Sequence, residues 1–423
     1  MENPGFSARQ FALTALLAAT ASVAVPPAAA AQYFGRNKVQ YGSFDFEVLK
    51  TDHFDVYHYP AERAAAEQAG RLAERWYARL SKVLDHRLHG RQPLILYASH
   101  PDFEQTNAIG GELGEGTGGV TEILKRRIVL PLAGPLAETN HVIGHELVHA
   151  FQFDITGQGQ GRFGVPGAAR LPLWFIEGMA EYLSLGPVDP NTAMWLRDAA
   201  QHHKLPTIRQ LYDPRYFPYR YGQAFWAFIA GHFGDEIVGQ ILRKAGRSGD
   251  ADGALLAVTG IRADSLALRW HAAIQADYAA LTQESKSADA YGRLLVGGDR
   301  RPGLNVAPAL SPDGTHLVFF SEKDLFSIDL YLAEGRTGEV KRRIIKTALD
   351  PHYQSLEFIN SSGAWDATGN RLAFGAVSQG KAVLSVLDVG HDLVAREIRL
   401  PRSGRSSTPP GLPTAATSRS RLS

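Results

Sequence analysis

The chain has 423 residues, of which 44% are hydrophobic, 10% aromatic and 21% charged, and its formal net charge at neutral pH is +1. This length and composition are those of a globular protein with two or three domains. A charge so close to zero argues against a dedicated nucleic-acid-binding protein. The sequence contains no cysteine, which excludes disulfides and zinc sites built from thiolates.

The first 31 residues are typical of a secretory signal peptide. Arg9 precedes an apolar stretch from Phe11 to Val25, and Ala29–Ala31 form an A-x-A cleavage site ahead of Gln32. The apolar stretch is too short for a spanning helix. We therefore expect cleavage near Ala31, a periplasmic or secreted protein, and no membrane span in the mature chain. An uncleaved N-terminal anchor is the alternative.

The region that follows predicts a sheet with a helix beside it. Alternating apolar and polar residues at 44–49 and 54–59 indicate an antiparallel hairpin. Residues 61–84 have the period of an amphipathic helix, and residues 93–98 have the composition of a buried strand. A glycine-rich loop and a strand follow within 110–130. Because glycine permits close backbone approach, this segment either borders a cleft or is a flexible loop without a role.

Residues 138–154 predict a helix that carries chemistry. It contains His145, Glu146 and His149 in the pattern H-E-x-x-H. The two histidines lie four residues apart, about one helical turn, so both imidazoles project from one face and can chelate a metal ion. Glu146 lies beside that face, where a carboxylate acts as a general base on water. The pattern also arises by chance in surface helices, so a third ligand is needed.

A second amphipathic helix, at residues 173–182, supplies a third ligand. Glu177 completes a His2Glu set with His145 and His149, which is the ligand set of a catalytic zinc ion with one coordination site open. Glu181 lies four residues later on the same helix face. It can accept the spare N–H of a ligating imidazole, which fixes the tautomer of that imidazole.

The H-E-x-x-H pattern, together with the segment Trp174-Phe-x-Glu-Gly-x-Ala-Glu-Tyr182, resembles the gluzincin metallopeptidases, the clan that contains thermolysin and the zinc aminopeptidases. The resemblance covers residues 140–182. It implies that two histidines and Glu177 bind Zn2+ and that Glu146 activates a water molecule. It also implies an edge strand before the zinc helix that pairs with an extended peptide substrate.

Hydrolysis by such a site also requires a hydrogen-bond donor for the oxyanion. The sequence offers Tyr219, Tyr221, His202 and His203 after the third ligand. In gluzincins a Tyr or His from this part of the chain has that role. We expect Tyr221 to be the donor, because its Tyr-Gly pair stands at the head of an apolar helix at 224–233.

The rest of this first domain is predicted to be helical. Residues 235–245, 251–258 and 264–282 indicate helices that form a lobe closing the floor of the cleft. Residues 32–290 are therefore expected to form an α+β zincin-type metallopeptidase domain, and the glycine-rich residues 291–303 a linker.

From residue 304 the pattern changes to short strands separated by turns. A Ser-Pro-Asp-Gly turn ends at Gly314 before a strand that contains Phe319, and Gly369 and Phe374 repeat this spacing. Residues 304–400 resemble TolB-like β-propeller repeats, which implies binding of other proteins or peptides. A propeller closes with at least four blades. We count about two, so we expect an incomplete, all-β propeller-like segment.

Residues 401–423 are rich in Ser, Thr, Pro and Arg and lack apolar periodicity, which predicts a disordered tail. Two open blades leave exposed sheet edges. We therefore favour a truncated or frame-shifted end of a longer protein over a natural tail.

The function expected from the sequence is that of a secreted or periplasmic zinc metallopeptidase that acts on a peptide or protein substrate, with Glu146 and Tyr221 as catalytic residues. One alternative is a metal-stabilised binding protein that engages an envelope partner through the propeller repeats. A hydrolase of other acyl substrates would use the same residues. The sequence leaves endopeptidase and exopeptidase action equally open.

Overall fold

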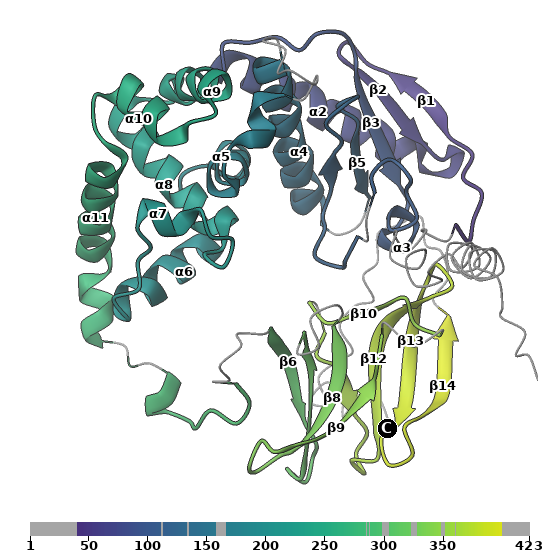
Figure 1. Cartoon of the computed structure of the whole chain (residues 1–423). Helices are drawn as coiled ribbons and strands as arrows, with labels where there is room; N and C mark the ends of the chain where they lie inside the picture. Colours follow the sequence, from purple (N-terminus) through teal and green to yellow (C-terminus); the bar gives the residue numbers. More distant parts are fainter. Residues whose placement is uncertain are drawn as a thin grey trace, which may run out of the picture.

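The structure has three regions in chain order: a mixed sheet with two long helices, a helical region, and two antiparallel sheets (Figure 1). This arrangement is of the α+β class, as expected. The predicted signal peptide and C-terminal tail lie outside the described residues. None of the described helices combines the length and hydropathy needed to cross a lipid bilayer. The computed structural model describes residues 40–110, 113–132, 135–157, 166–284, 286, 288–297, 304–322, 328–347, 352–359 and 361–399.

The first sheet has the strand order β1-β2-β3-β5-β4. The predicted hairpin is confirmed, because β1 and β2 pair antiparallel. Strands β2, β3 and β5 run parallel, and β4 is an antiparallel edge strand. The single strand predicted within 120–130 is wrong: Glu122 accepts hydrogen bonds from the backbone N–H groups of Leu124 and Lys125, which stabilises a turn between two strands. The bounds are β1 Glu47–Lys50, β2 Phe54–His58, β3 Gln92–Tyr97, β4 Val120–Thr121 and β5 Ile128–Pro131.

Helices α2 (Arg63–Val83) and α4 (Leu136–Gly157) pack against each other beside this sheet. The Trp76 ring of α2 lies against Gly144 of α4, where any added Cβ atom would overlap it. Its Nε1 donates a hydrogen bond of 2.9 Å to the backbone oxygen of Asn140. Trp76 therefore fixes the position of α4, the helix that carries the H-E-x-x-H pattern.

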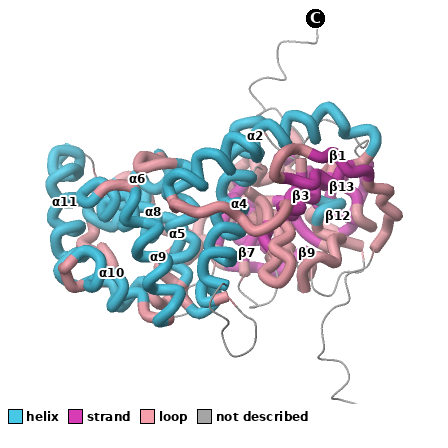
Figure 2. Tube along the Cα trace, turned by 90° about the horizontal axis from the view of Figure 1, so that it is seen from above, coloured by secondary structure: helices cyan, strands magenta, loops and turns pink. Residues whose placement is uncertain are grey.

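The helical region is centred on α5 (Leu173–Leu185) and α8 (Pro218–Phe233). Their backbones touch at Gly178 and Gly222, because a Cβ atom on either glycine would overlap the backbone of the other. Helix α6, which the sequence analysis missed, packs against α8. Figure 2 shows α5, α8 and α11 on one side of α4 and the strands on the other. The remaining helices are η1 Pro60–Glu62, α3 His100–Phe103, η2 Gly167–Arg170, α6 Pro190–Gln201, α7 Ile208–Leu211, α9 Glu236–Ser248, α10 Ala251–Thr259, α11 Ala263–Glu284 and η3 Ala288–Ala290.

The two C-terminal sheets repeat one pattern. Gly314 and Gly369 both have positive φ angles, of 74° and 73°, in the turns before β7 and β12. The first is a four-strand antiparallel meander, β6-β7-β8-β9, and the second has the antiparallel order β10-β12-β13-β14, with β11 also paired to β12. Within the described residues the two sheets do not close a propeller. The bounds are β6 Asn305–Leu310, β7 His316–Ser321, β8 Asp329–Glu334, β9 Val340–Ile345, β10 Ser355–Glu357, β11 Ala364–Trp365, β12 Arg371–Ser378, β13 Lys381–Asp388 and β14 Leu393–Arg399.

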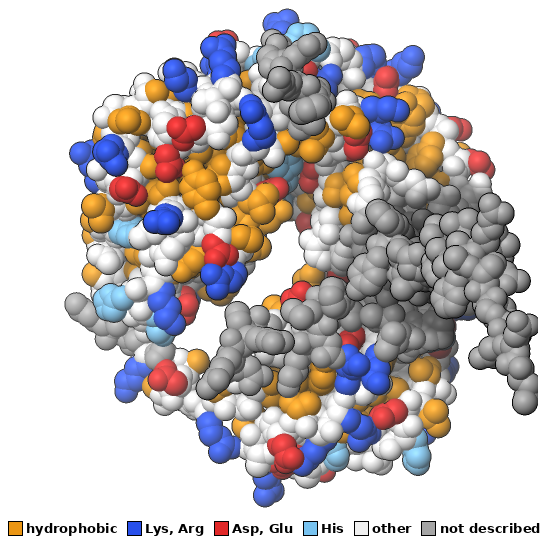
Figure 3. Space-filling view, in the orientation of Figure 1, with side chains coloured by type: hydrophobic (Ala, Val, Ile, Leu, Met, Phe, Trp, Pro, Cys, Tyr) orange, Lys and Arg blue, Asp and Glu red, His pale blue; other side chains and the backbone are white. Residues whose placement is uncertain are grey.

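The antiparallel sheets contact the first region through the glycine-rich loop that precedes β4. The Glu115 carboxylate accepts hydrogen bonds from the backbone N–H groups of Phe358, at 2.8 Å, and Ile359, at 3.1 Å. The space-filling view shows the molecule hollowed between the helical region and these sheets (Figure 3). We call this contact, between Glu115 and residues 355–359, the seam.

Candidate metal centre

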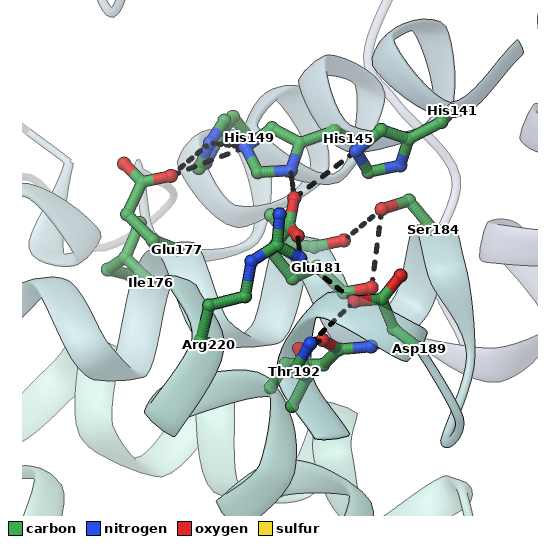
Figure 4. Close-up of polar contacts among 12 residues, drawn as sticks. His141, His145, His149, Ile176, Glu177, Glu181, Ser184, Asp189, Thr192 and Arg220 are labelled. Carbon is green, nitrogen blue, oxygen red and sulfur yellow. Dashed lines mark hydrogen bonds and ion pairs between the residues drawn. The ribbon is translucent and has the colours of Figure 1, made fainter. Parts of the chain in front are cut away.

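Helices α4 and α5 bring His145, His149 and Glu177 together (Figure 4). The two Nε2 atoms of the histidines are 3.2 Å apart. Glu177 Oε2 lies 3.3 Å from Nε2 of His145 and 3.2 Å from Nε2 of His149. An ion in tetrahedral coordination at about 2.0–2.1 Å from each ligand would hold these atoms roughly 3.3 Å apart. The three atoms therefore fit a zinc ion at one shared point.

The charges of this cluster also suit a cation. Burial lowers the pKa of His145, but the carboxylates of Glu177, Glu181 and Glu146 outweigh it and raise that pKa to about 10. Burial raises the pKa of Glu177, but the charge of His149 and the hydrogen bond with His145 hold it well below its usual range. Without a metal, the cluster therefore retains protons between its donor atoms, and a divalent cation displaces them on binding.

The tautomer of His149 is set by Gln152 on the same helix. The Gln152 side-chain amide nitrogen donates a hydrogen bond of 2.9 Å to the backbone oxygen of Ile176, which directs the amide oxygen toward His149. His149 Nδ1 lies 2.8 Å from that oxygen and donates to it. This leaves Nε2 of a neutral His149 free of hydrogen and able to ligate a metal.

Glu181 holds Nδ1 of His145 in the same way, which is the role predicted for it from the sequence. Glu181 Oε1 lies 2.9 Å from His145 Nδ1 and 3.3 Å from His141 Nε2. Arg220 Nη1 contacts the other oxygen of Glu181 at 3.0 Å and Asp189 Oδ1 at 3.3 Å (Figure 4). Burial raises the pKa of Glu181, but its hydrogen bonds with His141 and His145 lower it to about 2. Glu181 is therefore a carboxylate at any working pH.

Glu146 lies beside the cluster with only 5% of its surface exposed. The Thr121 hydroxyl of β4 is 2.7 Å from Glu146 Oε2 and 2.8 Å from the backbone oxygen of the same residue. Gly119 also lies against the Glu146 side chain, since an added Cβ atom would be 3.0 Å from its Cγ. The edge of the first sheet therefore holds the proposed general base in place.

The structure places Tyr219 rather than Tyr221 at the cluster. Helix α8 begins at Pro218, so the two tyrosines lie about 200° apart around it and face opposite sides. The Tyr219 ring stacks on the His145 ring with a centroid distance of 5.9 Å. The Tyr221 ring instead packs edge-on against Trp195, at 6.1 Å.

The charged groups that shift the pKa values of the two tyrosines also place Tyr219, and not Tyr221, at the cluster. Burial, followed by the charges of Glu177 and Glu146, raises the pKa of Tyr219. Burial and the charge of Asp198 raise the pKa of Tyr221. Tyr221 was expected because the helix was predicted to begin at residue 224, whereas it begins at Pro218.

The other two candidates for the oxyanion donor lie at the C-terminal end of α6. His202 donates a hydrogen bond from Nδ1 to the backbone oxygen of Asp198, and His203 directly follows it.

A second cluster joins His86, His89 and Asp154 near the end of α4. Asp154 Oδ2 lies 2.7 Å from His86 Nε2 and 2.8 Å from His89 Nδ1, and Arg126 contacts the other oxygen. These are hydrogen-bond distances, shorter than the ligand separations that a zinc ion imposes. We therefore assign the cluster to holding the end of α4 against the α2–β3 loop and the β4–β5 turn.

Four residues of the centre had not been predicted from the sequence: Thr121, His141, Gln152 and Arg220. His141 lies one helical turn before His145, and Gln152 lies three residues after His149, so helical periodicity could have indicated both. Arg220 reaches Glu181 only through the packing of α8 on α5, for which the sequence carries no local signal.

No family model and no curated protein matches this chain. The geometry of the cluster is therefore the basis for assigning a function. That geometry is a buried His-x-x-x-His pair on α4 and a glutamate on α5 that converge on one point, which makes a candidate metal site.

Proposed function

We propose that the chain is a zinc-dependent metallopeptidase of the gluzincin type. The observation that carries the proposal is the near-equal separation, 3.2 to 3.3 Å, of one carboxylate oxygen and two imidazole nitrogens from two different helices. Zinc is favoured because two histidines and one carboxylate, without a thiolate, are a ligand set of catalytic zinc ions. A second carboxylate, Glu146, lies next to these ligands and is the group that a hydrolase needs.

The residues around the cluster have distinct roles in the proposed reaction. A zinc ion held by His145, His149 and Glu177 would supply Lewis-acid activation of water and of a carbonyl group. Glu146 takes a proton from the attacking water and returns it to the leaving amine. Tyr219, whose raised pKa keeps its hydroxyl protonated, donates a hydrogen bond to the oxyanion. Tyr219 therefore replaces Tyr221 as the proposed oxyanion donor.

A peptide substrate is supported by the position of β4. This strand is the edge of the first sheet, and Thr121 at its end contacts the proposed general base. An extended peptide that pairs with such an edge would pass directly beside Glu146. Esters and other acyl compounds lack the repeated backbone groups that this pairing uses.

The proposal extends to the organisation of the chain. We propose a signal peptide at 1–31 that exports the protein to the periplasm or the medium, and a catalytic domain at 32–290 followed by a linker at 291–303. The two antiparallel sheets within 304–400, with their repeated glycine turns, support TolB-like blades that recruit a protein partner or substrate.

Glu146→Gln is the substitution that tests the catalytic proposal. We expect it to abolish cleavage of a peptide library, by about 10³-fold or more, while the purified protein keeps one zinc ion per chain by elemental analysis. His149→Ala should lose both the zinc and the activity. Glu67→Gln, at an exposed position on α2, is the matched control and should change neither. Full activity in Glu146→Gln, or a wild-type chain without stoichiometric zinc, would overturn the proposal.

A second candidate function is protein binding through the antiparallel sheets. It is favoured by β14, an edge strand that exposes Leu393, Val394 and Ile398. Retention of a binding partner after complete removal of zinc, together with no cleavage of peptides or esters by the zinc-loaded chain, would favour this function over the first.

A further inference from the structure

The hydrogen bonds of Thr121 point to a role beyond the stability of its strand. Thr121 lies in β4, and its hydroxyl is within hydrogen-bond distance of two oxygens of one residue, the backbone oxygen and Oε2 of Glu146. Within the described part of the chain it is the one side chain hydrogen-bonded to the Glu146 carboxyl group. A threonine that served only to fasten β4 to α4 would need the backbone oxygen alone.

The Thr121 hydroxyl can donate to Glu146 Oε2 both when the carboxyl group is ionised and when its other oxygen carries a proton. When Glu146 is ionised, the hydroxyl donates its one hydrogen to Oε2, and such a charge-assisted bond is the stronger of the two available. When Oε1 carries a proton, Oε2 is the carbonyl oxygen of the acid and still accepts the Thr121 hydrogen, with the backbone oxygen of Glu146 as a second acceptor.

Gly119 restricts the carboxyl group from another side. An added Cβ atom at this position would lie 3.0 Å from Glu146 Cγ and 3.2 Å from Oε1. The backbone of the loop therefore lies along the side chain while Thr121 holds its Oε2. Oε1 is the oxygen that no hydrogen bond of the described residues engages, so it is the one available to water.

We propose that Thr121 is a positioning residue that orients the Glu146 carboxyl group through its complete proton cycle. Oε1 receives the proton from water and releases it to the leaving amine, while Thr121 holds Oε2 throughout. This inference rests on the proposed function. It adds that the edge strand expected to align the substrate also sets the angle of the base, so substrate alignment and proton transfer are linked through one hydroxyl.

The test compares Thr121→Val, which keeps the shape but removes the hydroxyl, with Thr121→Ser, which keeps the hydroxyl. For Thr121→Val we expect kcat to fall by about tenfold to a hundredfold, with KM changed less than about twofold and zinc content unchanged. Thr121→Ser should recover most of the loss. Thr259→Val on α10 removes a comparable bond, from a threonine hydroxyl to the backbone oxygen of Leu255, and is the control for general destabilisation.

A second readout does not depend on turnover. In crystal structures we expect the Glu146 carboxyl group to keep one orientation in the wild type, in Thr121→Ser and in Thr259→Val, because each of these proteins keeps the hydroxyl that holds Oε2. In Thr121→Val we expect the carboxyl group to turn away from this orientation. A purely structural threonine would alter the melting temperature without turning Glu146.

The outcomes separate this inference from the proposed function. If the wild-type chain hydrolyses peptides, and Thr121→Val keeps both kcat and the orientation of Glu146, the positioning role is overturned and the peptidase stands. If Glu146 turns as expected in Thr121→Val but the wild-type chain cleaves nothing, the peptidase proposal fails and the orientation of Glu146 by Thr121 stands. If the wild-type chain cleaves nothing and Glu146 keeps its orientation in Thr121→Val, both are overturned.

Discussion

At the scale of single residues, the centre depends on side chains that hold the ligands as much as on the ligands themselves. His149 is oriented by Gln152, and His145 by Glu181, which Arg220 in turn holds. Each of the two histidines therefore has one ring nitrogen bound by the protein and the other directed at the point shared with Glu177. A histidine held in this way loses little conformational freedom when it binds a metal.

The ionised state of Glu181 leads to a prediction for zinc affinity. A carboxylate that accepts the Nδ1 hydrogen raises the basicity of the ligating imidazole, and its pKa of about 2 keeps Glu181 charged. Glu181→Gln should therefore weaken zinc binding by about 10-fold to 100-fold, as measured by competition with a coloured chelator at neutral pH. Glu122→Gln, in the β4–β5 turn, is the control, and equal affinity in both variants would contradict the role of Glu181.

At the scale of elements, the helices of the centre are spaced by backbone contact. Helices α5 and α8 touch at Gly178 and Gly222, next to Glu177 and close to Tyr219. No side chain separates the two helices at this point. The distance between the third ligand and the proposed oxyanion donor is therefore set by main-chain atoms.

Gly178→Ala tests this contact. The added methyl group would overlap the backbone of Gly222, and neither helix can move away without opening the core, so we expect a loss of about 1–3 kcal/mol or more in the free energy of unfolding. Gly231→Ala on α8 has open space around the new methyl group and should stabilise the protein by up to about 1 kcal/mol. Chemical denaturation measures both. Equal stability of the two variants would mean that the helices are not in contact there.

The sequence was sufficient to predict features that depend on residues close together in the chain. The four-residue spacing of His145 and His149 and the apolar period of the second helix were sufficient to find the three proposed ligands. Helix α6 was missed although Asp189, which accepts a hydrogen bond from the Thr192 N–H, and Pro190 form a standard helix start.

Other features of the centre could not be predicted, because they depend on packing between distant segments. Tyr221 was expected instead of Tyr219 because the helix was predicted to begin at residue 224, whereas α8 begins at Pro218 and Gly222 provides its contact with α5. The bond from Thr121 to Glu146 requires both the turn within 120–130 and the packing of β4 on α4. Neither follows from a periodic pattern.

At the scale of the whole molecule, the seam joins the antiparallel sheets to the first region through titratable groups. Burial, followed by the charge of Glu115, raises the pKa of Glu357 in β10 to about 7. Glu104 adds to this effect, and His100 opposes it. Burial also raises the pKa of Glu115.

These shifts predict that contact at the seam weakens as pH rises. Glu357 has an ordinary pKa of 4.5 when exposed and about 7 at the seam, so the docked state holds its proton more tightly. Docking is favoured below both values and loses up to about tenfold in its equilibrium constant per pH unit between them. Limited proteolysis of the chain between η3 and β6, which links the helical region to the antiparallel sheets, should therefore be faster at pH 8 than at pH 5.5.

The variant Glu357→Gln isolates this effect. It should remove most of the difference in proteolysis rate between pH 5.5 and 8, since the amide cannot ionise. Glu339→Gln, at an exposed position between β8 and β9, should keep the wild-type difference. A wild-type chain cleaved at the same rate at both pH values would show that Glu357 does not control the seam.

The seam also provides a short route for long-range communication. Glu115 anchors the loop that leads within a few residues to Thr121, and Thr121 holds Glu146. A partner that grips the C-terminal sheets and pulls them aside would release that loop and, with it, the hydroxyl that steers the base. The C-terminal sheets would then control the rate of the reaction without contacting the metal ion.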